Sequence, residues 1–118
     1  MKIDKTFLLD KAKFCLSPNS SERKSKEISL LVIHNISLPP GMYGGDYIEK
    51  FFTNQLNADD DPYFEDIIDL KVSSHLLIKR DGSITQFVPF NKKAWHACVS
   101  IFKDREDCIE FSIGIELE

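Results

Sequence analysis

The sequence predicts an α/β (α+β) protein with a mixed central β-sheet flanked by helices. Three observations lead to this prediction: a run of branched apolar residues at 28–34, an apolar stripe of helical spacing in 47–56, and strand-like segments at 72–79 and 83–88 around Arg80-Asp81-Gly82. The first run is typical of a strand that is covered on both faces. The last two segments indicate a hairpin, in which Gly supplies the positive φ of the turn.

The first part of the chain is polar, with a weak helical pattern over 4–15 and a stretch rich in Ser, Pro and Asn at 17–21. Such a pattern favours a short helix or coil followed by a surface loop. We therefore separate a leading helix/loop segment, residues 1–27, from a domain that occupies residues 28–118.

The remaining elements are predicted from capping residues and local composition. Asp46 is suited as the N-cap of the helix predicted over 47–56. An acidic loop is predicted over 57–62 and a helical turn over 63–70. A mostly irregular stretch follows over 90–107, and a final strand over 109–117.

Composition excludes several classes of protein. The 118 residues suit one domain, and a net charge of −4 argues against a nucleic-acid partner. No apolar run approaches the roughly 20 residues of a membrane span. The three cysteines, Cys15, Cys98 and Cys108, are odd in number and form no C-x-x-C pair, which favours reduced thiols in a cytoplasmic protein.

Two residues are candidates for chemistry by position. His34 ends the apolar run at 28–34, at the end of a strand where α/β sheets often place their sites. The alternative is a core histidine that makes one hydrogen bond. Glu116 lies in the alternating segment 111–118, where it shares a face with Glu118 and with Gly114, which leaves open space beside it.

A glutamate in so apolar a segment has its charged form disfavoured, which raises its pKa towards that of a general base working near neutral pH. The alternative is the solvent-facing edge of an amphipathic strand.

The other two histidines have less informative positions. His75 alternates with apolar neighbours and is expected to be packed rather than bound to a metal, although a site built from His34, His75 and His96 stays an alternative. Trp95 precedes His96 in a predicted loop, where an aromatic side chain can form the wall of a binding site or close the core.

Five blocks of the sequence resemble, in the same order, those of the AmpD-type amidases, a branch of the zinc-dependent amidases of type 2. They are residues 31–41 with Gly44-Gly45, then 72–82, 86–90, 94–97 and 111–118. The resemblance implies the fold that this family shares with phage T7 lysozyme and the peptidoglycan recognition proteins.

The resemblance also implies an activity: hydrolysis of the amide bond between (anhydro-)N-acetylmuramic acid and the L-alanine of the peptide stem, in bacterial peptidoglycan recycling in the cytoplasm. One zinc ion would be held by two histidines and an aspartate, the first histidine being His34, and Glu116 would be the catalytic residue. Asn35 and Trp95 would line the cleft for an anhydro-muropeptide substrate. The complete enzyme is expected to be a monomer without a membrane or nucleic-acid partner.

The sequence also departs from the family pattern. The family's other two zinc ligands lie beyond the position that matches Glu118, so 28–118 is expected to be the N-terminal portion of a domain truncated at its C-terminus, with little or no activity. Lys71 and Asp107 stand where arginines are expected to meet the peptide. Lys71 keeps a charge for substrate binding without the bidentate fork, whereas Asp107 reverses the charge.

Two alternatives to a working amidase stay open. One is a non-catalytic module that binds muropeptides through Asn35, Trp95 and their neighbours. The other is a gene product without a function, whose uncovered apolar face would promote aggregation.

Overall fold

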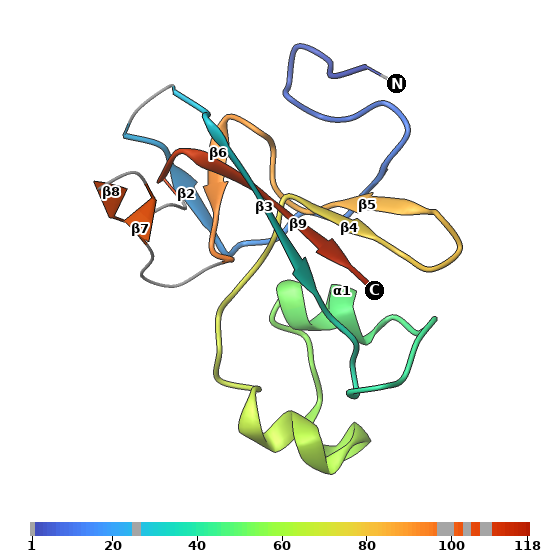
Figure 1. The fold of residues 1–118 in the computed structure, drawn as a ribbon. Coiled ribbons are helices and arrows are strands. Elements are labelled where there is room, and N and C mark those ends of the chain that lie inside the picture. Colours follow the sequence, from blue (N-terminus) through green and yellow to red (C-terminus); the bar gives the residue numbers. More distant parts are fainter. Residues whose placement is uncertain (1, 25–26, 97–100, 103–104, 107–109) are drawn as a thin grey trace.

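The computed structural model describes residues 2–24, 27–96, 101–102, 105–106 and 110–118. Its centre is a five-stranded sheet with the order β1-β5-β4-β9-β3 (Figure 1). These strands are Lys13–Phe14 (β1), Leu30–Asn35 (β3), Leu76–Ile78 (β4), Ile84–Gln86 (β5) and Ser112–Leu117 (β9). β4 and β5 are antiparallel, whereas β9 runs parallel to both of its neighbours and β1 runs parallel to β5. The predicted mixed sheet is confirmed.

The main core lies against one face of this sheet. The helix α1 (Tyr47–Phe52) contributes Ile48, Phe51 and Phe52, and they belong to the same buried cluster as Leu77 of β4. Two 3₁₀ turns follow α1, η1 (Ala58–Asp60) and η2 (Pro62–Asp66). No helix in the described part of the chain has the length and apolar character needed to cross a membrane.

Two small antiparallel sheets complete the described structure. β2 (Ser20–Glu22) pairs with β6 (Lys92–Ala94), and β7 (Ile101–Phe102) pairs with β8 (Arg105–Glu106). The stretch over 90–107, predicted to be mostly irregular, therefore contains strands at β6, β7 and β8, and the prediction misses the pairing of β6 with β2. The residues of β6 have no apolar alternation, and their partner strand lies far away in the sequence.

For residues 4–15 the sequence left a short helix or coil open, and the structure has no helix there. The Asp4 carboxylate accepts hydrogen bonds from the backbone N–H groups of Thr6 and Leu8, which makes a local turn that competes with a helix. Further along, the Cys15 N–H donates to the Gln86 carbonyl at 2.9 Å, which extends the pairing of β1 with β5. Tertiary pairing decides the conformation here.

The surface loop predicted at 17–21 is partly buried. Ser17 and Asn19 are 1% and 2% exposed, and both donate hydrogen bonds to the carbonyl of Phe52, the last residue of α1. The Asn19 amide also donates to the Val72 carbonyl at 2.9 Å and exchanges hydrogen bonds with the Asn54 side chain. Polar residues are stable in this position because each has partners.

The strand predicted at 28–34 forms as β3, but the prediction that both of its faces are buried is wrong. Leu31 and Ile33 are each 56% exposed. β3 is the last strand in the order of the sheet, and only its other face turns towards the packed side of the molecule.

The remaining local predictions hold in part. The hairpin is confirmed, with Gly82 at a φ of +86° and its N–H donating to the Lys79 carbonyl at 2.9 Å. The helix starts after Asp46 as predicted, although the side chain of Asp46 makes no capping hydrogen bond. α1 ends at Phe52, short of the predicted 56, because Asn54 adopts a left-handed conformation with a φ of +61°.

Candidate active site

His34 and Glu116 lie side by side on the sheet. They are register partners in the parallel strands β3 and β9, and Glu116 is in turn the partner of Leu77 in β4. Residues in register on adjacent strands point to the same face, so the carboxylate of Glu116 lies between an imidazole and a fully buried leucine.

Burial changes the chemistry of Glu116. The side chain is 9% exposed, and its Oε2 atom is buried without a hydrogen-bond partner in the described residues. Burial raises the pKa of Glu116 to about 7, because a desolvated carboxylate is disfavoured in its charged form. The alternative of a solvent-facing strand edge is therefore wrong: Glu116 lies on the buried face of β9.

Glu118 has a different environment from Glu116. It follows β9, and its carboxylate accepts hydrogen bonds from the backbone N–H groups of Gly44, at 2.9 Å, and Arg80, at 3.4 Å. Glu118 thus connects the end of the strand to two loops.

His96 occupies the space beside Gly114 that the sequence suggested was open. A Cβ atom added to Gly114 would lie 2.5 Å from the Cδ2 atom of His96. The ring centroids of His96 and His34 are 5.9 Å apart. Burial, together with the smaller effects of nearby His34 and Arg23, lowers the pKa of His96 to about 4, so the ring is neutral near pH 7.

His75 has a structural role, as predicted. It is fully buried, and its Nδ1 atom accepts the Gly114 N–H at 3.1 Å. The proton therefore lies on Nε2, which donates to the Lys92 carbonyl at 2.7 Å. Both ring nitrogens are used, which argues against the three-histidine site.

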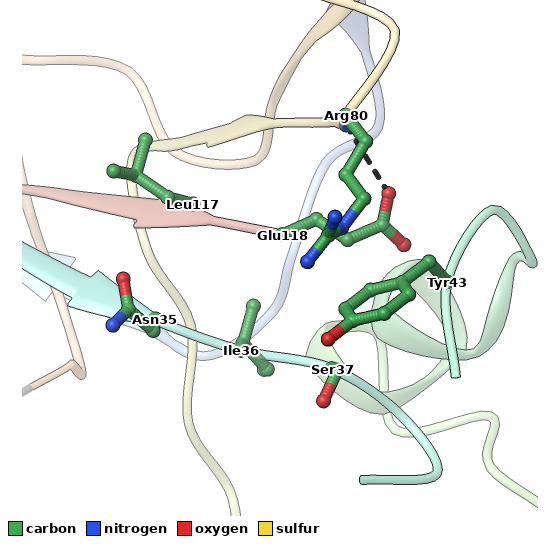
Figure 2. Close-up of a pocket in the computed structure, with 7 residues that line it drawn as sticks. All are labelled: Asn35, Ile36, Ser37, Tyr43, Arg80, Leu117 and Glu118. Atoms are coloured by element: carbon green, nitrogen blue, oxygen red, sulfur yellow. Dashed lines mark hydrogen bonds between the residues drawn. The ribbon is translucent and has the colours of Figure 1, made fainter. Parts of the chain in front are cut away.

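Asn35 lies on the other face of the sheet, because side chains alternate along a strand. It lines a hollow of about 480 Å³ at the ends of β3 and β9, shown in Figure 2. The guanidinium of Arg80 stacks over the Tyr43 ring there, 3.5 Å from its centroid. Neither His34 nor Glu116 lines this hollow.

The other predicted substrate-binding residues are dispersed. Trp95 is half-buried next to His96, and its Nε1–H donates to the Ser21 hydroxyl at 3.1 Å. Lys71 is exposed in the segment before β4. Asp107 lies outside the described residues, as do Cys98 and Cys108, whereas Cys15 is a free thiol.

Comparison with known proteins places this geometry in a family. Residues 24–118 match the family model described as N-acetylmuramoyl-L-alanine amidase. The chain belongs to this family.

Relatives and solved structures agree with the amidase assignment. The chain is 53% identical, over 116 residues, to the 1,6-anhydro-N-acetylmuramyl-L-alanine amidase AmpD of Salmonella typhimurium, a match that covers 98% of the chain and 62% of the relative. It is also 53% identical to AmpD of Escherichia coli K12, over 86% of the chain and 56% of that protein. A crystal structure of an Se-Met AmpD derivative superposes with a TM-score of 0.95 at 50% identity, covering 99% of this chain and 65% of the other. The chain therefore spans about three-fifths of the length of these relatives.

Amidases of this family are generally zinc-dependent, so the ligand set matters. The Nε2 atom of His34 is buried and has no hydrogen-bond partner among the described residues, which suits a metal ligand. Within that part of the chain, however, no group of three His, Cys, Asp or Glu side chains could hold a metal ion. The described residues of this amidase chain thus offer one ligand and do not form a complete zinc site.

Sequence analysis missed two residues that build the site. The guanidinium of Arg23 donates to the backbone carbonyls of Glu110 and Ser112, both at 2.9 Å, and so holds the start of β9. The hydroxyl of Ser112 contacts the Nε2 atom of His96 at 3.0 Å. Ser112 was detectable in principle, because it alternates with Gly114 and Glu116 on one face. Nothing in the spacing of Arg23 pointed to its role.

Proposed function

We propose that this chain contains the catalytic glutamate and the first zinc ligand of an amidase that cleaves the bond between (anhydro-)N-acetylmuramic acid and the L-alanine of a peptide stem. One observation carries the proposal: Glu116, buried and in register with His34, has a pKa raised to about 7 in a chain of the amidase family. A pKa near the working pH is what a general base and acid requires.

Glu116 is proposed to move the proton of the reaction. Its carboxylate accepts a proton from the attacking water and then donates it to the nitrogen of the leaving L-alanine, so that the amine leaves uncharged. The unpaired and buried Oε2 atom supports this role, because it has hydrogen-bonding capacity that the described residues do not use.

Zinc is the proposed cofactor, with the Nε2 atom of His34 as one ligand. Since the described residues offer no complete ligand set, no step of the reaction is assigned to the metal. The 118-residue chain alone is accordingly expected to release little or no peptide.

Asn35, Trp95 and Lys71 are the proposed substrate-binding residues. Asn35 is the one that the fold supports least, because it faces the hollow on the side of the sheet opposite Glu116. We place the reaction in the bacterial cytoplasm, in peptidoglycan recycling, with a monomeric enzyme that needs neither membrane nor nucleic acid.

The test is a fusion of this chain to the segment of the Salmonella relative that lies beyond the match. Release of free peptide from an anhydro-muropeptide is followed by mass spectrometry, with and without a zinc chelator. We expect chelator-sensitive release that falls by at least about a hundredfold in Glu116→Gln. Glu118→Gln is the matched control, because that carboxylate bonds to backbone N–H groups instead. A folded, zinc-loaded fusion that releases no peptide would contradict the proposal.

A muropeptide-binding module without catalysis is the second candidate, and it is favoured for the 118-residue chain because the described residues offer only His34 as a ligand. Titration of the 118-residue chain with anhydro-muropeptide, followed by chemical shifts, tests this candidate. Absence of any shift at millimolar ligand would exclude it.

A further inference from the structure

The approach of His96 to β9 is closer than any residue other than glycine would allow. A Cβ atom on Gly114 would lie 2.5 Å from Cδ2 and 2.7 Å from Cγ of the His96 ring, distances that real Cβ atoms essentially never show. The backbone of Gly114 has no positive φ that would itself call for glycine. The missing side chain at this position therefore serves to seat the imidazole ring on the strand.

Ser112 fixes the orientation of the seated ring. It is fully buried, two residues before Gly114 on the same face of β9, and its hydroxyl lies 3.0 Å from the Nε2 atom of His96. Within the described residues this contact is the hydroxyl's only hydrogen bond. One hydrogen joins the two atoms, and which of them donates depends on the tautomer of the ring. The Nδ1 atom of His96 is buried without a partner among the described residues, so within them Ser112 makes the only hydrogen bond of the ring.

His34 has no such anchor of its own. Histidines that bind a metal usually donate their second ring N–H to a carboxylate or carbonyl, which fixes the ring. The described residues offer the imidazole of His34 no hydrogen bond, and its Nε2 atom is buried without a partner. What His34 has instead is the ring of His96, at a centroid distance of 5.9 Å and an angle of 52°.

We propose that His96 is a positioning residue: seated on Gly114 and fixed by Ser112, its ring packs against His34 and holds that imidazole beside Glu116. The packing of His96 against His34 is independent of the proposed function. Its importance for zinc binding rests on the proposed function. Three residues, His96, Gly114 and Ser112, thus orient the imidazole of His34.

The test uses the 118-residue chain without metal or substrate, labelled with ¹⁵N and observed by long-range proton–nitrogen correlation of the histidine rings. We expect the ring signals of His34 to shift towards those of a freely rotating imidazole in His96→Ala. In His96→Phe, which keeps a flat ring but no nitrogen, they are expected to stay near their original positions. Ser112→Ala should shift the ring nitrogen signals of His96, because it removes the hydrogen bond at Nε2.

Gly114→Ala should move the ring signals of both His96 and His34. Gly45→Ala is the matched glycine control, because its Cβ atom would meet only Tyr47, at 3.8 Å. If Gly114→Ala does not fold, His96→Ala and His96→Phe still decide. Unchanged His34 ring signals in a folded His96→Ala chain would overturn the proposal. Since neither zinc nor turnover enters the readout, this outcome is distinct from a failure of the amidase proposal.

Discussion

The two faces of the strand pair β3 and β9 differ in burial, and here the face with polar side chains is the more buried one. One face presents His34, Ser112, Gly114 and Glu116, and on β9 it is buried. The other presents apolar side chains such as Leu31 and Ile33, which are largely exposed. Burial on β9 follows what packs against the strand, such as the ring of His96, and not the hydropathy of the strand. A polar face that is buried despite its cost is typical of a functional site.

The largest expected effect comes from removing apolar contacts on the buried face. Leu77→Ala empties a position that is 0% exposed beside Glu116, and should lower the free energy of unfolding by about 2–5 kcal/mol. Leu31→Ala makes the same change on the exposed face and should cost less than about 0.5 kcal/mol. Urea unfolding of both variants measures the difference. Equal losses would show that the two faces are equally packed.

The pH dependence of stability offers a sharper test of the buried face. The raised pKa of Glu116, about 7, means that the folded chain keeps a proton there that the unfolded chain loses near pH 4.5. The lowered pKa values of His75 and His96, about 4, mean that the unfolded chain binds protons below pH 6.5 that the folded chain does not. Between pH 4.5 and 6.5 these contributions oppose each other.

Glu116→Gln removes the opposing contribution. In the metal-free variant, the free energy of unfolding should therefore rise with pH more steeply than in the original chain between pH 4.5 and 6.5. Urea titrations at several pH values measure the slope. An unchanged slope in the variant would mean that Glu116 is ionised across this range.

The smallest effect on stability is expected on the apolar face. Ile33→Thr keeps a β-branched side chain in β3 and should change the free energy of unfolding by no more than about 0.5 kcal/mol. It should nevertheless weaken self-association, because Ile33 is 56% exposed on an edge strand. Sedimentation velocity over a range of concentrations measures this. Asn35→Thr is the control on the same face, and an equal effect of both would argue against an apolar cause.

Local patterns predicted the elements whose cause is local. The hairpin around Gly82 and the start of α1 after Asp46 were predictable because a turn glycine and a helix stripe act over a few residues. The segment 4–15 was not, because its conformation depends on hydrogen bonds to Gln86 far along the chain. The weak helical pattern of that segment competes poorly with such pairing.

The site was predictable at its reactive groups and not in its support. His34 and Glu116 stood out because a histidine at a strand end and a glutamate in an apolar strand are unusual. The contact of His96 with Gly114 was not predictable. A glycine in a strand indicates that another group comes close, but the sequence does not show that this group is the His96 ring. The side of the sheet on which Asn35 lies follows from strand alternation alone, and could have been inferred from the phase of His34 in β3.

The place of β9 has a consequence for synthesis on the ribosome. Although β9 follows the other four strands of the described sheet in the sequence, it lies between β3 and β4 and is the only strand that joins them there (Figure 1). While the chain emerges from its N-terminus, β3 has no partner in this sheet and exposes two open edges. The nascent sheet stays in two parts until residues 112–117 arrive. A chaperone that shields strand edges would therefore act on β3 until residues 112–117 have emerged.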